Sequence, residues 1–198
     1  QKYFGCYTQA WGFRLAYVYT VHSDGCMDVS LTGTAIRNPE FEPEFLPRIG
    51  VELYADRSLA NVSWYGLGPG ENYSDSRQAA VMGNYVKPQE NGHRENVKWL
   101  ALTDSRDGLL IKAKRAFGIN VHDYTAESLR SAPHPKDIKK EDFIVLNLDY
   151  KQSGLGSNSC GQGQTEEHRT PIEDFALAFS LSFVQREKLL AEARTEYR

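Results

Sequence analysis

Residues 13–36 read FRLAYVYTVHSDGCMDVSLTGTAI, and this stretch decides the class of fold that the sequence predicts. The segment 13–21 is rich in aromatic and β-branched residues, and the segment 27–36 alternates apolar with polar side chains. The turn sequence Ser23-Asp24-Gly25 lies between them. The two segments therefore predict two strands that form a hairpin with a three-residue turn.

Similar segments predict an all-β, antiparallel fold for the rest of the chain. Turn residues recur roughly every eight to fifteen positions, which favours a sandwich over β-α-β units. We expect further strands at 49–55, 61–65, 96–103, 109–115, 117–121, 143–150 and 175–183.

Helical signals are few and short. Residues 75–85 could form one or two turns, and Thr125 is a suitable N-cap for another short helix. The highly charged segment 185–197 predicts a terminal helix or a frayed end. We therefore divide the chain into one β-rich domain, residues 1–184, and a charged helical or disordered tail, residues 185–198.

Composition excludes several classes of function. The chain has 198 residues and a formal net charge of −3, and no basic stripe suggests a nucleic-acid partner. No apolar run approaches the length of a membrane span. The start, Gln1-Lys2-Tyr3-Phe4, has neither an initiator Met nor the regions of a signal peptide, so we expect a piece of a longer protein.

The three cysteines, Cys6, Cys26 and Cys160, are widely spaced and form no CxxC pair. They indicate neither a zinc site nor a disulfide framework, which fits a reducing compartment. We expect the cytoplasm, with the periplasm as the alternative. The five histidines form no HxH or HExxH pattern, so the sequence predicts no metal site in this chain.

Residues 64–73 read WYGLGPGENY and are the most unusual segment of the chain. Glycine tolerates backbone angles that other residues resist, and Pro69 removes a backbone donor, so a strand should end here. Glu71, Asn72 and Tyr73 are then presented from a loop. Such polar residues either serve a site or cap their own backbone.

Three more polar clusters interrupt the strands, at 88–96, 120–124 and 147–161. The glycine-rich part of the last one is not a phosphate-binding loop, because no Gly-Lys-Ser/Thr and no helix follow it. Cys160 is a poor candidate for a nucleophile, because no histidine is spaced to act as its base.

Glu71, Glu90 and Asp149 lie in or beside these loops and could act as paired carboxylates in glycoside chemistry. Spacing alone cannot establish such a pair. We favour a structural role, in which Glu71 and Glu90 form buried ion pairs with Arg77 and Arg94.

In this order the clusters resemble a known family. The segments that carry the resemblance are Arg48-Ile49-Gly50, residues 64–73 with Asp75 and Arg77, residues 88–92 with Arg94, Asn147-Leu148-Asp149 and residues 154–161. They are similar to the C-terminal domain of the β-galactosidases of glycoside hydrolase family two, which in some bacteria is a separate small subunit. The resemblance covers roughly residues 10–184.

The resemblance implies an antiparallel β-supersandwich similar to galactose mutarotase, within an enzyme that hydrolyses terminal β-D-galactosides such as lactose with retention. The family's catalytic glutamates and magnesium site lie in a barrel domain that nothing here matches. The resemblance therefore implies a noncatalytic domain without a cofactor of its own, which forms one wall of the active-site cleft. Its partner would be the rest of the chain or a large subunit, in a parent enzyme that is a homo-oligomer.

The resemblance also assigns site residues. In the best-known members the loop equivalent to 157–161 carries a tryptophan on which the second sugar stacks. Cys160 falls at that position when the loop is aligned through Ser159, and Gly161 does so without a gap; either way we expect a more open aglycone subsite. The expected substrate-binding residues are Asn158, Ser159, Cys160 and Gly161, and the expected loop-holding residues near the cleft are Glu71, Asn72, Tyr73, Glu90, Asn91 and Arg94.

Two other functions remain open at this point. A free-standing aldose 1-epimerase of the mutarotase type would need a general acid and a general base, usually Glu and His, at one sugar carbon. A stand-alone carbohydrate-binding module would need an exposed aromatic platform.

Overall fold

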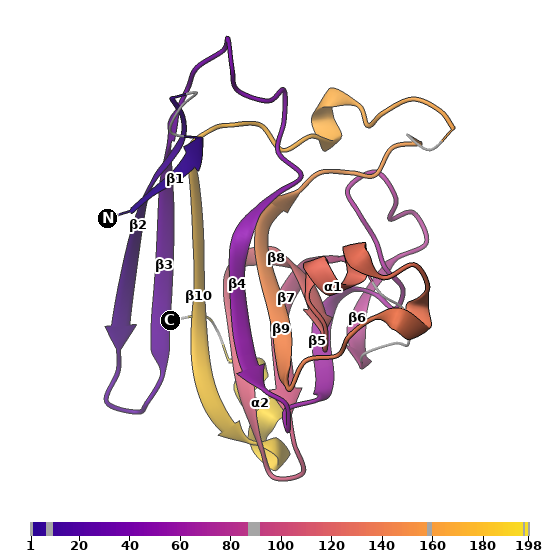
Figure 1. Cartoon of the computed structure of the whole chain (residues 1–198). Helices are drawn as coiled ribbons and strands as arrows, with labels where there is room; N and C mark the ends of the chain where they lie inside the picture. The colour runs from indigo at the N-terminus through magenta and orange to yellow at the C-terminus, as the bar shows by residue number, and fades with distance from the viewer. Residues whose placement is uncertain (1, 7–9, 87–91, 158–159, 196, 198) are drawn as a thin grey trace.

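A computed structural model describes residues 2–6, 10–86, 92–157, 160–195 and 197, and in these residues the chain is all-β with a few short helices (Figure 1). The strands are β1 (Lys2–Cys6), β2 (Trp11–Val21), β3 (Met27–Ile36), β4 (Arg48–Asp56), β5 (Asn61–Gly68), β6 (Val81–Val86), β7 (Arg94–Thr103), β8 (Asp107–His122), β9 (Phe143–Gln152) and β10 (Phe175–Gln185). The α-helices are α1 (Ala126–Ser131) and α2 (Leu189–Ala193), and 3-10 turns lie at Pro135–Asp137, Glu166–His168 and Arg186–Lys188.

All described strand pairs are antiparallel. The main path runs β1-β2-β3-β10-β8-β7-β5-β6, and β9 branches from β8 and carries β4 on its far side. The branch arises because β8 is long: Asp107–Ala113 pairs with β10, whereas Gly118–His122 pairs with β9. The predicted antiparallel, all-β class is therefore confirmed.

The main core lies between the β4–β9 layer and the inner faces of the other strands. It includes Leu31, Trp64, Phe117, Leu146 and Phe179, all nearly inaccessible to solvent. Burying such large side chains is the main favourable term in the stability of a domain. The two layers therefore form one sandwich around one core.

Local sequence explains several elements. In the predicted β2–β3 hairpin, Gly25 has φ +83° and Asp24 Oδ1 accepts a hydrogen bond from the backbone of Cys26 at 3.0 Å. Glycine adopts positive φ at little cost, so this turn sequence suits the hairpin. The predicted helix after Thr125 is also present, and Thr125 Oγ1 accepts from Ser128 N at 3.1 Å.

Two predictions about local structure are wrong. Residues 75–85 form no helix, because Tyr73 bridges Ser76 and the segment 81–86 pairs with β5 as a strand. The separate strands expected at 109–115 and 117–121 are one strand, β8.

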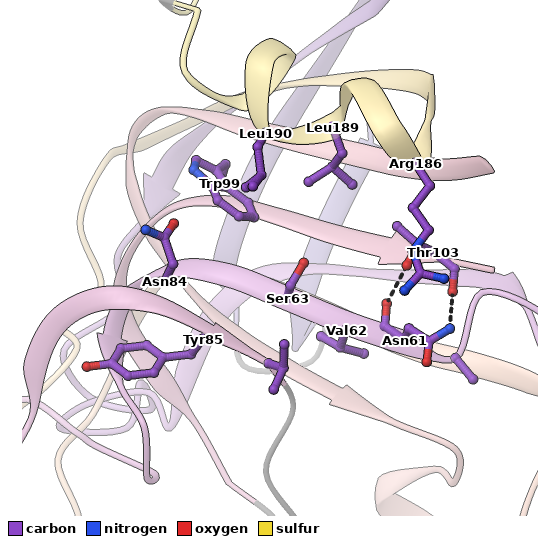
Figure 2. A pocket seen from close by; sticks show the side chains of 12 residues that line it. Asn61, Val62, Ser63, Asn84, Tyr85, Trp99, Thr103, Arg186, Leu189 and Leu190 are labelled. Carbon is purple, nitrogen blue, oxygen red and sulfur yellow. Dashed lines mark hydrogen bonds between the residues drawn. The ribbon is translucent and has the colours of Figure 1, made fainter. Parts of the chain in front are cut away.

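The C-terminal segment forms a short helix, which was one of the two alternatives for it. Leu189 and Ala193 of α2 are buried against Trp99, Ala101 and Leu110, which face away from the main core. Figure 2 shows Leu189 and Leu190 lying over Trp99.

Candidate functional site

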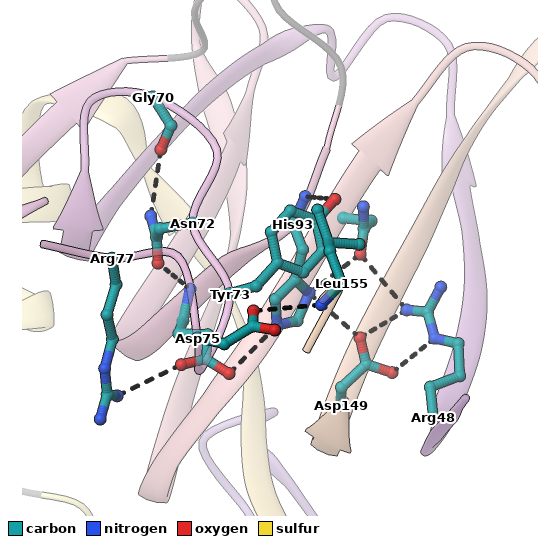
Figure 3. A network of polar contacts seen from close by, with 11 residues as sticks. Arg48, Gly70, Asn72, Tyr73, Asp75, Arg77, His93, Asp149 and Leu155 are labelled. Carbon is teal, nitrogen blue, oxygen red and sulfur yellow. Dashed lines mark hydrogen bonds and ion pairs between the residues drawn. The ribbon is translucent and has the colours of Figure 1, made fainter. Parts of the chain in front are cut away.

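The conspicuous polar loops meet at one end of the sandwich, around an ion pair between a buried carboxylate and a partly exposed arginine (Figure 3). Arg48 of β4 forms two hydrogen bonds with the carboxylate of Asp149 of β9, one of them 3.0 Å long from Nε to Oδ1. The register between these strands shifts at Ile49/Gly50, and a Cβ on Gly50 would lie 2.4 Å from Asp149 Oδ1. Glycine at position 50 therefore leaves the space that this carboxylate fills.

His93 lies next to this pair and is buried with it. Its Nδ1 is 3.1 Å from Asn120 Oδ1 and 3.6 Å from Asp149 Oδ2. Asn120 Oδ1 also accepts from Arg48 Nη2 at 3.4 Å. An amide oxygen only accepts hydrogen bonds, so this network assigns the ring proton to Nδ1.

Burial sets the charge of both groups. It lowers the pKa of His93 to about 4, with smaller contributions from the positive charges of Arg48 and Arg94. Burial also raises the pKa of Asp149 to about 6, against the opposing effect of Arg48. A buried site disfavours the charged form of any group. Here burial outweighs the hydrogen bond to Asn120 for His93, and it outweighs the charge of Arg48 for Asp149. His93 is therefore neutral at pH 7.

Asn72 attaches the glycine-rich loop 66–73 to the start of β7. Its backbone N donates to His93 O at 2.8 Å, its Oδ1 accepts from Glu95 N at 2.9 Å, and its Nδ2 donates to Gly70 O at 3.0 Å. The ring of Tyr73 stacks on His93 with centroids 5.6 Å apart. Nearly every polar atom of Asn72 is thus used to hold backbone.

Asp75 attaches the second glycine-rich loop to the first. Its carboxylate accepts from the backbone N of Leu155 at 3.1 Å and from that of Gly156 at 2.7 Å. A Cβ on Gly154 would lie 2.3 Å from Asp75 Oδ2, and Gly156 has φ +61°. The glycines of this loop therefore permit the close approach on which these hydrogen bonds depend.

The structure locates six of the ten predicted site residues. Asn72 and Arg94 are buried, Tyr73 is half-buried, and Glu71, Cys160 and Gly161 are exposed. Cys160 and Gly161 both donate backbone hydrogen bonds to Ser157 O, at 3.0 and 2.5 Å. Glu90, Asn91, Asn158 and Ser159 lie outside the described residues.

Of the two expected ion pairs, that of Glu90 lies outside the described residues, and that of Glu71 can be checked for burial. Glu71 is exposed, so the expectation of a buried Glu71 is wrong. Arg77 pairs instead with Glu95, at 3.3 Å, and Arg94 donates to Gly92 O at 2.6 Å while its guanidinium lies over Trp64. Among the described residues, Arg48 pairs with the buried Asp149, which the sequence did not indicate, because these partners are far apart in the chain.

Away from this polar network, a hollow of about 670 Å³ lies between β5–β7 and the C-terminal helical segment (Figure 2). Its walls include Ser63, Asn84, Trp99, Arg186 and Leu190. None of the described site residues predicted from the sequence lines it, so we do not assign the site there.

Within the described ranges, no three His, Cys, Asp or Glu side chains come together as a possible metal site. The same residues contain no helix long and apolar enough to cross a membrane. The fold and the site together define an all-β domain in which two polar side chains, Asn72 and Asp75, hold the loops at one end of the sandwich.

Comparison with known proteins gives the family. The profile of the β-galactosidase small chain matches residues 5–181, and the chain belongs to this family. It is 32% identical to a β-galactosidase of Actinobacillus pleuropneumoniae over 83% of this chain and 17% of that one. It is 40% identical to one of Arthrobacter sp. strain B7 over 58% and 13%, and 27% identical to one of Kluyveromyces lactis over 87% and 18%. The chain thus spans less than a fifth of these relatives.

Proposed function

We propose that this chain is a noncatalytic domain of a β-galactosidase, and that the loop 154–161 forms part of one wall of the active-site cleft. The observation that carries the proposal is the way this loop is held. Asp75 binds its backbone at Leu155 and Gly156, while Leu155, Ser157, Cys160 and Gly161 remain exposed.

A loop held in this way suits a binding surface. Its backbone at Leu155 and Gly156 is held by the half-buried Asp75, so less conformational freedom remains to be lost there when a sugar binds. Exposed residues on a fixed loop can then set specificity without disturbing the packing beneath them.

The described titratable groups suit this role better than catalysis. His93 and Asp149 are both buried, and Asp149 is bound by Arg48, so neither can reach a sugar carbon in this structure. A general acid or base must come within hydrogen-bond reach of the proton that it transfers. This geometry supports the proposal over an aldose 1-epimerase that would use this histidine, and we place the catalytic glutamates and the magnesium ion outside this chain.

Cys160→Trp in the complete enzyme tests the proposal. If Cys160 occupies the position next to the second sugar, the new ring should add a stacking surface worth roughly 1 kcal/mol. We expect KM for lactose to fall about fivefold, because about 1.4 kcal/mol corresponds to tenfold in binding. KM for a small aryl galactoside should change less.

Leu129→Trp is the matched control, because Leu129 is also exposed but lies on α1, outside this loop. It should leave KM for lactose unchanged. An equal effect of both variants, or no effect of Cys160→Trp and of Gly161→Trp, would contradict the assignment of this loop to the cleft.

A further inference from the structure

The side chains on the inner face of β2 become more exposed to solvent toward the C-terminal end of the strand. Phe13, Leu15, Tyr17, Tyr19 and Val21 share this face, since side chains alternate along a strand. Phe13 is only 4% exposed, whereas Tyr19 is 61% and Val21 is 73% exposed. These side chains are all apolar or aromatic, which is unusual for a solvent-facing end of a strand.

Side-chain exposure also rises across the sheet, from β10 through β3 to β2. Phe179 of β10, Val29 of β3 and Tyr19 of β2 are neighbours in one cross-strand row. Their exposed fractions are 1%, 5% and 61%. The second layer therefore covers β10 and β3 and stops before it reaches β2.

The strand at which the second layer stops is β4. In the described part of the chain β4 pairs only with β9, so its other edge has unpaired backbone groups. Between this edge and β2 lies an apolar groove of about 670 Å³, walled by Tyr17, Tyr19, Met27, Val51 and Leu53. A connecting hollow of about 450 Å³ shares Phe4, Leu15 and Tyr17 with it.

We propose that this groove receives a β-strand from the part of the β-galactosidase outside these 198 residues. The strand pairs with the free edge of β4 and places alternate apolar side chains on Tyr17, Tyr19 and Val21. This inference rests on the proposed function, because it needs a larger enzyme. The matched region is 13–18% of the length of three relatives, so such an enzyme has ample chain to supply the strand.

A strand fits the groove for geometric reasons. Adjacent strands lie about 4.8 Å apart and stacked sheets about 10 Å apart, so a strand added beside β4 continues the layer that already covers β3. The edge supplies backbone hydrogen bonds and the groove supplies contacts for every second side chain. The chain end near β1 lies close to the same region, because Lys2 pairs with Leu15 and leaves 16–21 without a neighbour on that side among the described residues.

Cysteine labelling tests the proposal with a matched pair of variants. Val21→Cys lies on the same face of β2 as Tyr17 and Tyr19, one alternate position beyond the groove-lining Tyr19. Val18→Cys lies on the opposite face of the same strand, where Val18 is 58% exposed. Maleimide labelling of each site is followed by mass spectrometry, which separates it from the native cysteines. In the isolated chain both sites should react at similar rates. In the complete gene product Val21→Cys should react at least a hundredfold more slowly than it does in the isolated chain. The reaction rate of Val18→Cys should be the same in both.

Several results would overturn the proposal. These are an equally reactive Val21→Cys in the complete product, equal protection of both sites, or a product with no chain beyond these residues. Protection that appears in the isolated chain as its concentration rises would mean that a second copy covers the groove. Lactose binding to the isolated chain that Tyr19→Ala abolishes would make the face a sugar platform instead.

The proposed function is tested separately by turnover of an aryl galactoside with the unmodified complete product. An active product with a reactive Val21→Cys overturns the groove proposal alone. An inactive product with a protected Val21→Cys overturns the β-galactosidase proposal and leaves the strand-binding groove.

Discussion

Asp149→Asn should reveal a pH dependence of stability that the intact network hides. In the folded chain the pKa of His93 is about 4, against an ordinary 6.5, and the pKa of Asp149 is about 6, against an ordinary 3.8. Each difference makes the free energy of unfolding depend on pH, because the folded and unfolded chains bind protons differently. The two dependences have opposite signs.

The signs follow from the directions of the two shifts. The folded pKa of His93 is lowered, so the stability that it contributes is present above pH 6.5 and is lost as the pH falls toward 4. The folded pKa of Asp149 is raised, so its contribution is present below pH 3.8 and is lost as the pH rises through 6. At about 1.36 kcal/mol per pKa unit, each contribution is roughly 3 kcal/mol.

Between about pH 4 and pH 6 these contributions cancel. The folded chain holds one proton on Asp149, and the unfolded chain holds one on His93, so this pair binds the same number of protons in both states. Asparagine at position 149 cannot take up that proton. The variant should therefore lose about 3 kcal/mol more stability than the parent chain between about pH 7 and pH 4.

Urea unfolding of the isolated chain at several pH values measures this difference. Asp137→Asn, which changes an exposed carboxylate, is the control and should give a curve parallel to that of the parent. Adding His93→Gln to Asp149→Asn should abolish the extra loss. A gap between Asp149→Asn and the parent that stays constant or narrows with acid would refute the reasoning. It would show that the charge of Arg48 outweighs burial and keeps Asp149 ionised.

Two further predictions concern the C-terminal helix and the held loop. Leu189→Ala should lower the free energy of unfolding by about 2–3 kcal/mol, because this side chain is buried against Trp99. Glu192→Ala, at an exposed position of the same helix, should cost less than about 0.5 kcal/mol, and equal losses in urea unfolding would contradict the packing of α2. Asp75→Ala should leave the amides of Leu155 and Gly156 without their acceptor and reduce their protection from hydrogen exchange about tenfold or more. The control Gln78→Ala should leave this protection unchanged. Unchanged protection in Asp75→Ala would show that the loop does not depend on Asp75.

Much of the fold could be predicted because its signals are local. The hairpin of β2 and β3 is specified by alternation on each side of a turn sequence, and the observed β3 has the predicted bounds, Met27–Ile36. The error at 75–85 has a physical cause as well. Val81–Val86 is a mostly exposed edge strand that pairs only with β5 in the described residues, so no buried face imposes a period on its sequence.

The sequence predicted which loops form the site, but it did not predict which side chains contact one another there. The glycine-rich segments marked where polar residues leave the sheet, because glycine at close approaches is visible in the sequence. The pairing of Arg48 with Asp149 depends on the register of β4 and β9, whose paired residues are about a hundred positions apart. Registers between distant strands are set by packing of the whole core, and one sequence does not display them.

The polar network around Asp149 suggests how the base of the loops could stay fixed while the substrate specificity of the proposed cleft changes. Asp149, His93 and Asn72 are buried, whereas Arg48 is partly exposed. These residues bind one another or backbone, and replacing a buried one leaves its partner unpaired at a cost of roughly a few kcal/mol. Cys160 is exposed, and its backbone N donates to Ser157 O, so its side chain lies outside the packed interior. Substitutions that alter the choice of galactoside should therefore be tolerated at the tip of this loop and rejected at its base. Under the proposed function, this separation of base from tip would let the domain change substrate choice without loss of its own packing.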